Sequence, residues 1–148
     1  MSSLTQASIL IDADPGMVLD IIADFEAYPE WASDVKRVEV LCEEGDGWED
    51  RVEYTLDAGV IRDTYVLEYE WNMADDGTGV VSWQLVDARV LRTMNGSYTI
   101  ARHRRGGTKV TYRLAVDLYP PLLGVLKRLA EEQIVNSALR ELKVRAEA

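Results

Sequence analysis

Tyrosine and tryptophan side chains recur at alternate positions of several segments with period-2 hydrophobicity. A buried hydroxyl without a partner costs about 1–3 kcal/mol, and a core that serves packing alone favours Leu, Ile and Val. Several phenols and indoles on one inward face therefore predict a pocket with apolar walls and a few hydrogen-bonding groups. The alternative is that the rings fill the interior and place their hydroxyls at its rim. The residues on this inward side are Tyr54, Tyr65, Tyr69, Trp71, Trp83, Tyr98 and Tyr112.

Other polar and aromatic positions allow more than one interpretation. Trp31 follows Tyr28-Pro29 at a junction between short helical turns and a strand, where it could form the pocket rim or pin the corner of the fold. Arg62 and Arg92 lie near strand ends, where they could meet an anionic ligand group, but we interpret them as surface charges. Asp63 shares the parity of Tyr65, and we assign it no role.

The residue types of nucleophilic and metal chemistry are scarce. The 148 residues include one histidine, His103, and one cysteine, Cys42. His103 lies among arginines beside a Gly-Gly turn, so no Ser–His–Asp or Cys–His arrangement can be assembled around it. A lone histidine and a lone cysteine also predict no transition-metal site and no intrachain disulfide. We therefore predict no catalytic residue, no metal ligand and no cofactor.

Composition and charge limit the class of protein. The length predicts one domain over residues 1–148, and no apolar run is long enough to span a membrane. The N-terminus lacks a secretory signal, which with the single cysteine predicts a cytoplasmic location. The net charge is −10, with 20 acidic and 4 basic residues up to position 80 and 6 acidic and 12 basic residues after it. Phosphate repels such an anion, so direct nucleic-acid binding is not expected.

The hydrophobic period changes along the chain and predicts the order of elements. Residues 4–11 alternate as a strand, and a helix begins at Pro15 with Asp14 as its N-cap, followed by a further short helical turn after Pro29. Six alternating segments follow, with turns at 43–47, 57–59, 75–79 and 105–107. From residue 122 a period near 3.6 predicts a helix of about 25 residues. Its stripe is Leu123, Leu126, Ala130, Ile134, Ala138 and Leu142.

A helix of that length buries its stripe only by crossing the apolar face of a curved sheet. This order of elements, with Ile9-Leu-Ile-Asp-Ala-Asp-Pro-Gly and Asp24-Phe-Glu-Ala-Tyr-Pro-Glu-Trp31, resembles the START-like helix-grip superfamily (SRPBCC). Within it, the chain is similar to the polyketide cyclase/dehydrase and coenzyme Q-binding branch. Gly96-Ser-Tyr-Thr, Gly106-Gly-Thr-Lys-Val-Thr-Tyr-Arg-Leu and Pro121-Leu-Leu-Gly-Val-Leu-Lys-Arg extend the resemblance. It implies an α+β fold: a seven-stranded antiparallel sheet curved around a long C-terminal helix, with one or two short helices after the first strand.

The resemblance also implies a cavity between the sheet and the helix, which in members of the superfamily holds lipids, sterols, quinones, plant hormones or polyketides. Aromatase/cyclases of this branch place an inward arginine where this chain has Tyr69 and a serine where it has Leu67. Without that fixed positive charge, developing enolate charge would lack its stabilising group. We predict the ligand-binding residues to be Trp31, Tyr54, Tyr65, Leu67, Tyr69, Trp83, Tyr98, Leu126 and Ile134.

Three functions follow as hypotheses. The first is non-catalytic binding of a hydrophobic small molecule, such as a lipid, a quinone or a polyketide, by a monomer or weak homodimer. The second is a polyketide aromatase/cyclase or dehydrase. The third is a ribosome- or protein-associating module, because some relatives in this branch look like toxin-type ribosome-associating factors.

Overall fold

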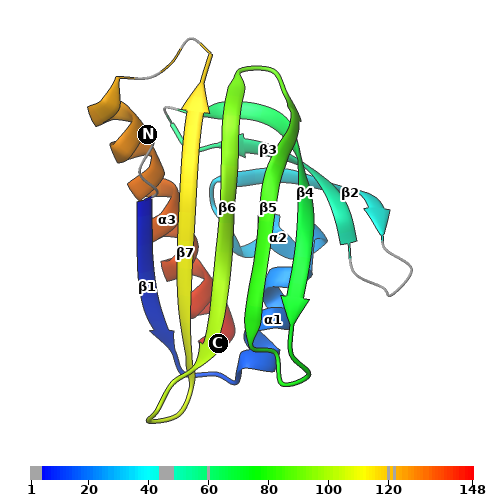
Figure 1. The fold of residues 1–148 in the computed structure, drawn as a ribbon, viewed down its shortest axis with the longest axis vertical. Coiled ribbons are helices and arrows are strands. Elements are labelled where there is room, and N and C mark those ends of the chain that lie inside the picture. The colour runs from blue at the N-terminus through cyan, green and yellow to red at the C-terminus, as the bar shows by residue number, and fades with distance from the viewer. Residues whose placement is uncertain (1–4, 44–48, 60, 120, 122) are drawn as a thin grey trace.

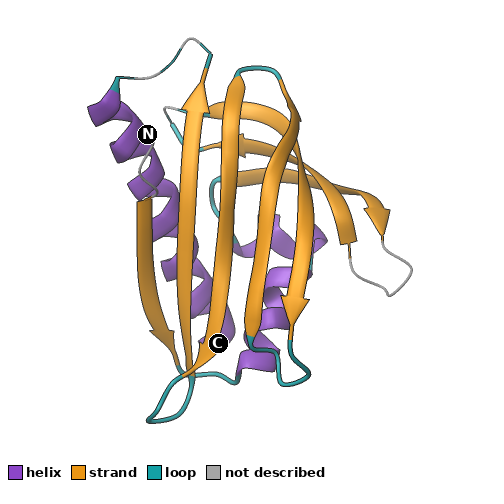
Figure 2. Ribbon diagram, in the orientation of Figure 1, coloured by secondary structure: helices purple, strands orange, loops and turns teal. Residues whose placement is uncertain are grey.

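The computed structural model describes residues 5–43, 49–59, 61–119, 121 and 123–148. In it, a long helix packs against one face of a bent sheet (Figure 1). Strands make up most of the molecule, with short helices beside them and one long helix at the C-terminal end (Figure 2). The strands are β1 (Thr5–Ile11), β2 (Val35–Glu43), β3 (Glu49–Asp57), β4 (Arg62–Met73), β5 (Gly79–Ala88), β6 (Leu91–Arg102) and β7 (Thr108–Leu118). The helices are α1 (Pro15–Ala23), the 3-10 turn η1 (Phe25–Ala27), α2 (Tyr28–Trp31) and α3 (Gly124–Glu147).

The sheet has seven antiparallel strands in the order β1-β7-β6-β5-β4-β3-β2. Strands β2 to β7 form a meander, whereas β1 joins the far edge beside β7. The segment from α1 to α2 therefore carries the chain from one edge of the sheet to the other (Figure 1). This arrangement confirms the expected α+β helix-grip fold, with a sheet that bends so that β2 and β3 cross the direction of β5–β7.

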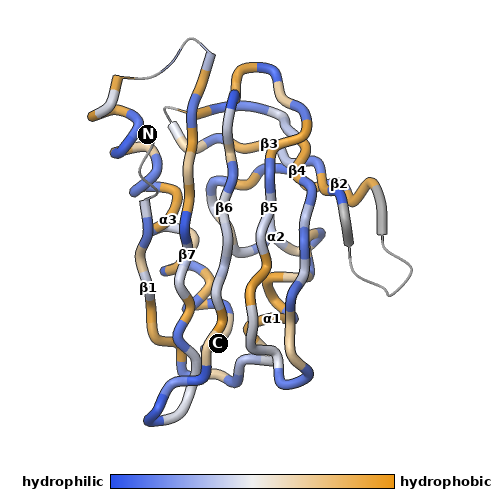
Figure 3. Tube along the Cα trace, viewed as in Figure 1, coloured by the Kyte–Doolittle hydropathy of each residue, from blue (hydrophilic) through white to orange (hydrophobic). Residues whose placement is uncertain are grey.

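Alternation within each strand sorts the side chains as the sequence predicts. In β4, Asp63, Tyr65, Leu67 and Tyr69 are buried while the residues between them are partly exposed. In Figure 3 the turn between β6 and β7 is hydrophilic, whereas hydrophobic residues are interspersed along the strands. Strand register then places aromatic residues opposite one another: Tyr54 faces Tyr65 and Tyr69 faces Trp83. Each such cross-strand pair stabilises the sheet by about 0.2–1 kcal/mol.

The long helix is buried over only part of its length. It packs mainly against β1 and β7, and its first buried residue is Ala130. The prediction that its apolar stripe is buried from Leu123 onward is therefore wrong for the first turns, where Leu126 exposes 42% of its surface. These turns lie beyond the start of β1, so that strand does not cover them (Figure 1). No helix of the described residues is long and apolar enough to cross a membrane.

Glu131 is a buried carboxylate that the helical stripe did not predict. Its Oε1 accepts a hydrogen bond from Thr5 Oγ1 at 2.7 Å. Its Oε2 accepts from the Val116 backbone N–H at 2.7 Å and from Lys127 Nζ at 2.6 Å. Among the described residues, the β1–β7 pairing extends as far as Thr5 and Leu114, and the carboxylate supplies an acceptor to the Val116 N–H beyond that pair. Glu131 thus fastens α3 to the edge strand β1 and to its neighbour β7.

Asp63 has a structural role in the turn between β5 and β6. Its Oδ2 accepts hydrogen bonds from the backbone N–H groups of Arg89, Val90 and Leu91 at 2.9–3.2 Å. The carboxylate therefore holds that turn against the start of β4. The predicted turn at 43–47 falls largely on residues 44–48, which lie outside the described residues.

Candidate ligand-binding site

A cavity of about 80 Å³ lies between the inner face of the sheet, α2 and α3. Most of the residues predicted to bind a ligand meet around it. Leu126 does not, because it lies on the exposed first turns of α3. The predicted binding residues omitted Tyr112 and Ala138, although the sequence placed both on inward faces, and both line the cavity. They also omitted Asp34 and Glu141, which belong to neither the aromatic pattern nor the helical stripe but line it as well. The predicted residues at the cavity are Trp31, Tyr54, Tyr65, Leu67, Tyr69, Trp83, Tyr98 and Ile134.

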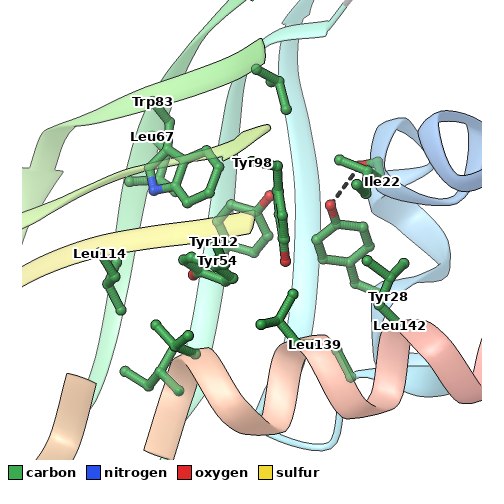
Figure 4. Close-up of a cluster of buried hydrophobic side chains, with 14 of the residues drawn as sticks. Ile22, Tyr28, Tyr54, Leu67, Trp83, Tyr98, Tyr112, Leu114, Leu139 and Leu142 are labelled. Atoms are coloured by element: carbon green, nitrogen blue, oxygen red, sulfur yellow. Dashed lines mark hydrogen bonds between the residues drawn. The ribbon is translucent and has the colours of Figure 1, made fainter. Parts of the chain in front are cut away.

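The cavity wall is a continuous series of aromatic contacts. Tyr54 stacks on Tyr65 with ring centroids 5.6 Å apart. Trp83 lies 5.6 Å from Tyr69 and 5.4 Å from Tyr98. Aromatic pairs at these distances each contribute about 0.5–1.5 kcal/mol beyond the area that they bury. Figure 4 shows Tyr54, Tyr98 and Tyr112 gathered between the strands and α3, with Leu139 and Leu142 on the helix facing them.

Gly96 makes room for this wall. It lies opposite Trp83 in the β5–β6 ladder, and the indole covers it. A methyl group at residue 96 would lie 2.8 Å from Trp83 Cζ2 and 2.5 Å from the carbonyl oxygen of Arg113. Because both distances are shorter than van der Waals contact, only glycine lets Trp83 lie flat against the strand.

The tyrosine hydroxyls fall into two groups. Tyr54 and Tyr69 share a hydrogen bond of 2.6 Å, and the Tyr28 hydroxyl donates to the backbone carbonyl of Ile22 (Figure 4). In contrast, the hydroxyls of three other buried tyrosines, Tyr65, Tyr98 and Tyr112, hydrogen-bond to none of the described residues.

These three free hydroxyls border the cavity. All three residues, Tyr65, Tyr98 and Tyr112, line it, and each exposes no more than 7% of its surface. No fully buried polar side-chain atom of the described residues lacks a partner. The three oxygens therefore face the open space of the cavity, where a ligand or water can accept a hydrogen bond from each hydroxyl.

The environment keeps the phenols protonated. Burial raises the pKa values of Tyr54, Tyr69 and Tyr98 well above the usual range of a phenol. Burial likewise raises the pKa values of Tyr65 and Tyr112. At neutral pH these groups therefore act as hydrogen-bond donors and not as bases.

Carboxylates from two elements line the cavity beside this wall. Asp34 lies between α2 and β2, and Glu141 lies on α3, where its Oε1 accepts a hydrogen bond from the Ser33 backbone N–H at 3.1 Å. Burial and, second, the charge of Glu141 raise the pKa of Asp34, outweighing the opposite effects of Lys36 and Arg140. No Lys, Arg or His is among the described residues that line the cavity. We call Asp34 and Glu141 the acidic rim.

The remaining polar candidates lie away from the cavity. Arg62 pairs with Asp57 at 3.1 Å and is largely exposed. Arg92 is exposed and does not line the cavity. His103 lies at the β6–β7 turn, where its Nδ1 accepts from the Arg105 backbone N–H at 3.4 Å. The described residues contain no group of three or more His, Cys, Asp or Glu residues that could hold a metal ion. The side chain of Cys42 lies outside the described residues.

The sequence and the fold both match known proteins. The family model described as polyketide cyclase / dehydrase and lipid transport matches residues 4–147. A START superfamily protein from Mycobacterium smegmatis superposes with a TM-score of 0.88 at 16% identity, over 99% of this chain and 98% of that one.

Two further solved structures share the fold. The Zhui aromatase/cyclase from Streptomyces sp. R1128 matches with a TM-score of 0.74 at 18% identity, over 98% of this chain and 93% of that one. A STAR-related lipid transfer protein from Xanthomonas axonopodis matches with a TM-score of 0.77 at 17% identity, over 98% of this chain and 86% of that one. These likenesses show a shared fold, which in one relative serves an aromatase/cyclase and in another a lipid transfer protein.

Proposed function

The chain belongs to the polyketide cyclase/dehydrase and lipid transport family, and from this premise we propose that it binds an apolar, ring-containing small molecule in the aromatic cavity without catalysing a reaction. A lipid, a quinone or a polyketide has the required apolar surface. The observation that carries the proposal is that the hydroxyls of Tyr65, Tyr98 and Tyr112 face the cavity and hydrogen-bond to none of the described residues.

The energetics of these hydroxyls support a ligand. Phenylalanine would fill the same space without removing a hydroxyl from water, which costs about 1–3 kcal/mol when no hydrogen bond replaces the lost one. Three hydroxyls around one space therefore need water or a ligand as a hydrogen-bond partner, which a core that serves packing alone does not provide. A ligand with a hydrogen-bond acceptor regains that energy, and the indole and phenol rings supply the apolar contact.

The size of the cavity requires that ligand entry widen it. A volume of about 80 Å³ holds two or three water molecules at about 30 Å³ each. Ligand pockets usually measure about 300–1,000 Å³. The side chains best placed to give way are those between α2 and α3, where Trp31 is half-buried and Ala32 and Ala138 are small. We propose that Trp31 turns outward and the two helices separate as the ligand enters.

A polyketide aromatase/cyclase is the second candidate, and Asp34 is the observation that favours it. A carboxyl group with a raised pKa beside phenol donors is a candidate general acid or base. The lining lacks the inward cation expected of that branch, because Tyr69 stands at its position. Catalysis through Asp34 predicts that Asp34→Asn abolishes turnover of a poly-β-ketone substrate while leaving its affinity unchanged. Binding without catalysis predicts no turnover by the unaltered protein.

The binding proposal is tested by thermal unfolding with a panel of ring ligands and lipids. A ligand at 100 times its Kd adds about 2.7 kcal/mol of stability. For a domain of this size that raises Tm by about 5–11 °C. Ala138→Phe fills the space between α3 and α2 and should abolish the increase. Asn136→Phe adds the same ring at an exposed position of α3 and should retain it.

Two outcomes would contradict the proposal. One is that no ligand class in the panel raises Tm. The other is that Ala138→Phe and the unaltered protein respond equally, because the ligand would then bind elsewhere. The expectations of a cytoplasmic location and of a monomer or weak homodimer stay predictions.

A further inference from the structure

The cavity combines two kinds of polar group in one place. Given the binding proposed above, we infer that it selects uncharged ring compounds bearing a carbonyl oxygen and excludes the corresponding carboxylates. The interior offers hydrogen-bond donors on Tyr65, Tyr98 and Tyr112, and the acidic rim of Asp34 and Glu141 adds negative charge.

The interior groups define the acceptor. Each free hydroxyl is a phenol that burial keeps protonated, so each can donate one hydrogen bond into the cavity. Tyr98 and Tyr112 lie together, with ring centroids 4.6 Å apart, and both rings contact Trp83. A planar ring against this wall brings a carbonyl substituent within reach of these donors. A saturated hydrocarbon would leave them unpaired.

The acidic rim acts against a negative charge. Asp34 and Glu141 come from separate elements and both line the cavity. After burial, the negative charge of Glu141 is the largest effect that raises the pKa of Asp34. The two carboxylates therefore repel one another, and a third carboxylate brought to this place would be repelled by both.

Within the described part of the chain, no cationic side chain of the cavity wall offsets this repulsion. None of the described lining residues is cationic. Lys36 and Arg140 act on Asp34 from exposed positions, and Lys36 Nζ donates to the Ser33 carbonyl at 2.7 Å. Arg62, which could in principle bind an anionic ligand group, is paired with Asp57. A buried carboxylate without a cation or sufficient hydrogen bonds is costly, so an anionic ligand loses affinity.

The test compares two ligands of nearly the same shape, 2-acetonaphthone and 2-naphthoate, at neutral pH. Amide chemical shifts followed by NMR give both the Kd and the location of binding. We expect the unaltered protein to bind the ketone at least tenfold more tightly. In Asp34→Asn/Glu141→Gln the affinity for the carboxylate should rise until the two ligands differ by less than threefold.

A matched control separates the rim from the net charge. Glu39→Gln/Glu132→Gln removes the same charge from exposed positions that do not line the cavity, and should keep the tenfold preference. Equal binding of both ligands by the unaltered protein, or a preference that survives in the rim variant, would overturn the selectivity alone. If neither ligand causes shifts at the cavity, the selectivity fails, whereas the proposed binding function fails only if no ligand class of the panel raises Tm.

Discussion

Replacing Tyr98 by phenylalanine removes one oxygen atom from the cavity wall and leaves the ring in place. The Tyr98 hydroxyl hydrogen-bonds to none of the described residues, so the folded protein loses no hydrogen bond. The unfolded chain loses a hydrated hydroxyl. The free energy of unfolding should therefore stay the same or rise by up to about 1 kcal/mol, which raises Tm by at most about 4 °C.

Tyr54→Phe is the matched control, because its hydroxyl is bonded. It would break the 2.6 Å hydrogen bond between Tyr54 and Tyr69 and leave the Tyr69 hydroxyl unpaired. The net value of such a bond is about 0.5–1.5 kcal/mol, and an unpaired buried group adds to the loss. We expect Tyr54→Phe to lower the free energy of unfolding by about 1–2 kcal/mol. The two variants thus differ in the sign of their effect.

Urea unfolding followed by tryptophan fluorescence measures both free energies. The same variants are then titrated with 2-acetonaphthone. Loss of the hydrogen bond between the Tyr98 hydroxyl and the ketone should weaken binding by about three- to tenfold in Tyr98→Phe. A more stable protein that binds less well is the pattern expected of a residue retained for its ligand.

The reasoning is refuted if Tyr98→Phe loses as much stability as Tyr54→Phe. The Tyr98 hydroxyl would then have a partner in the folded protein, and its contact with the cavity would not call for a ligand. Equal ketone affinity of Tyr98→Phe and the unaltered protein would remove this hydroxyl from the binding site.

Four further substitutions test other parts of the structure. Glu131→Ala should lower the free energy of unfolding by about 2–4 kcal/mol in urea titrations, because it leaves a buried backbone N–H and a lysine without their acceptor. As a control, Glu132→Ala at an exposed position should change that free energy by less than about 0.5 kcal/mol. Asp63→Ala should cost about 2–4 kcal/mol, since three backbone N–H groups lose their acceptor, and a loss below 1 kcal/mol would show that water replaces it. Gly96→Ala should lower Tm and weaken ring-ligand binding, because a methyl group has no room beneath the indole that covers the strand; unchanged near-ultraviolet circular dichroism would contradict this. Asp34→Asn should stabilise the protein at neutral pH, because a raised pKa means that folding disfavours the charged form. That gain should vanish as the pH falls toward the pKa of an unfolded aspartate, about 3.9, and a gain that persists there would have another cause.

Much of the fold was predictable because it depends on local periodicity. Period-2 alternation assigned Tyr65, Leu67 and Tyr69 to the inward face of one strand, and the structure buries all three. A proline at the first helical position and an aspartate before it marked the start of α1. These signals arise within a few neighbouring residues, so they can be read without knowledge of the rest of the chain.

The content of the site depended on tertiary structure. The alternating pattern placed the phenols inside. Only strand register and packing determined that the Tyr54 hydroxyl bonds to Tyr69, while the Tyr98 hydroxyl bonds to none of the described residues. The helical period likewise marked Leu126 as inward, yet the sheet edge ends before it and leaves it exposed.

The acidic rim shows the same division. Asp34 and Glu141 are more than 100 positions apart, and no pattern along the chain relates them. They line one cavity because α3 crosses the sheet beside α2, at a separation set by the volumes of all the side chains between them. The amino-acid order by itself determined which faces are apolar, since that choice is local. The shape and charge of the space between those faces arose only when distant elements packed together.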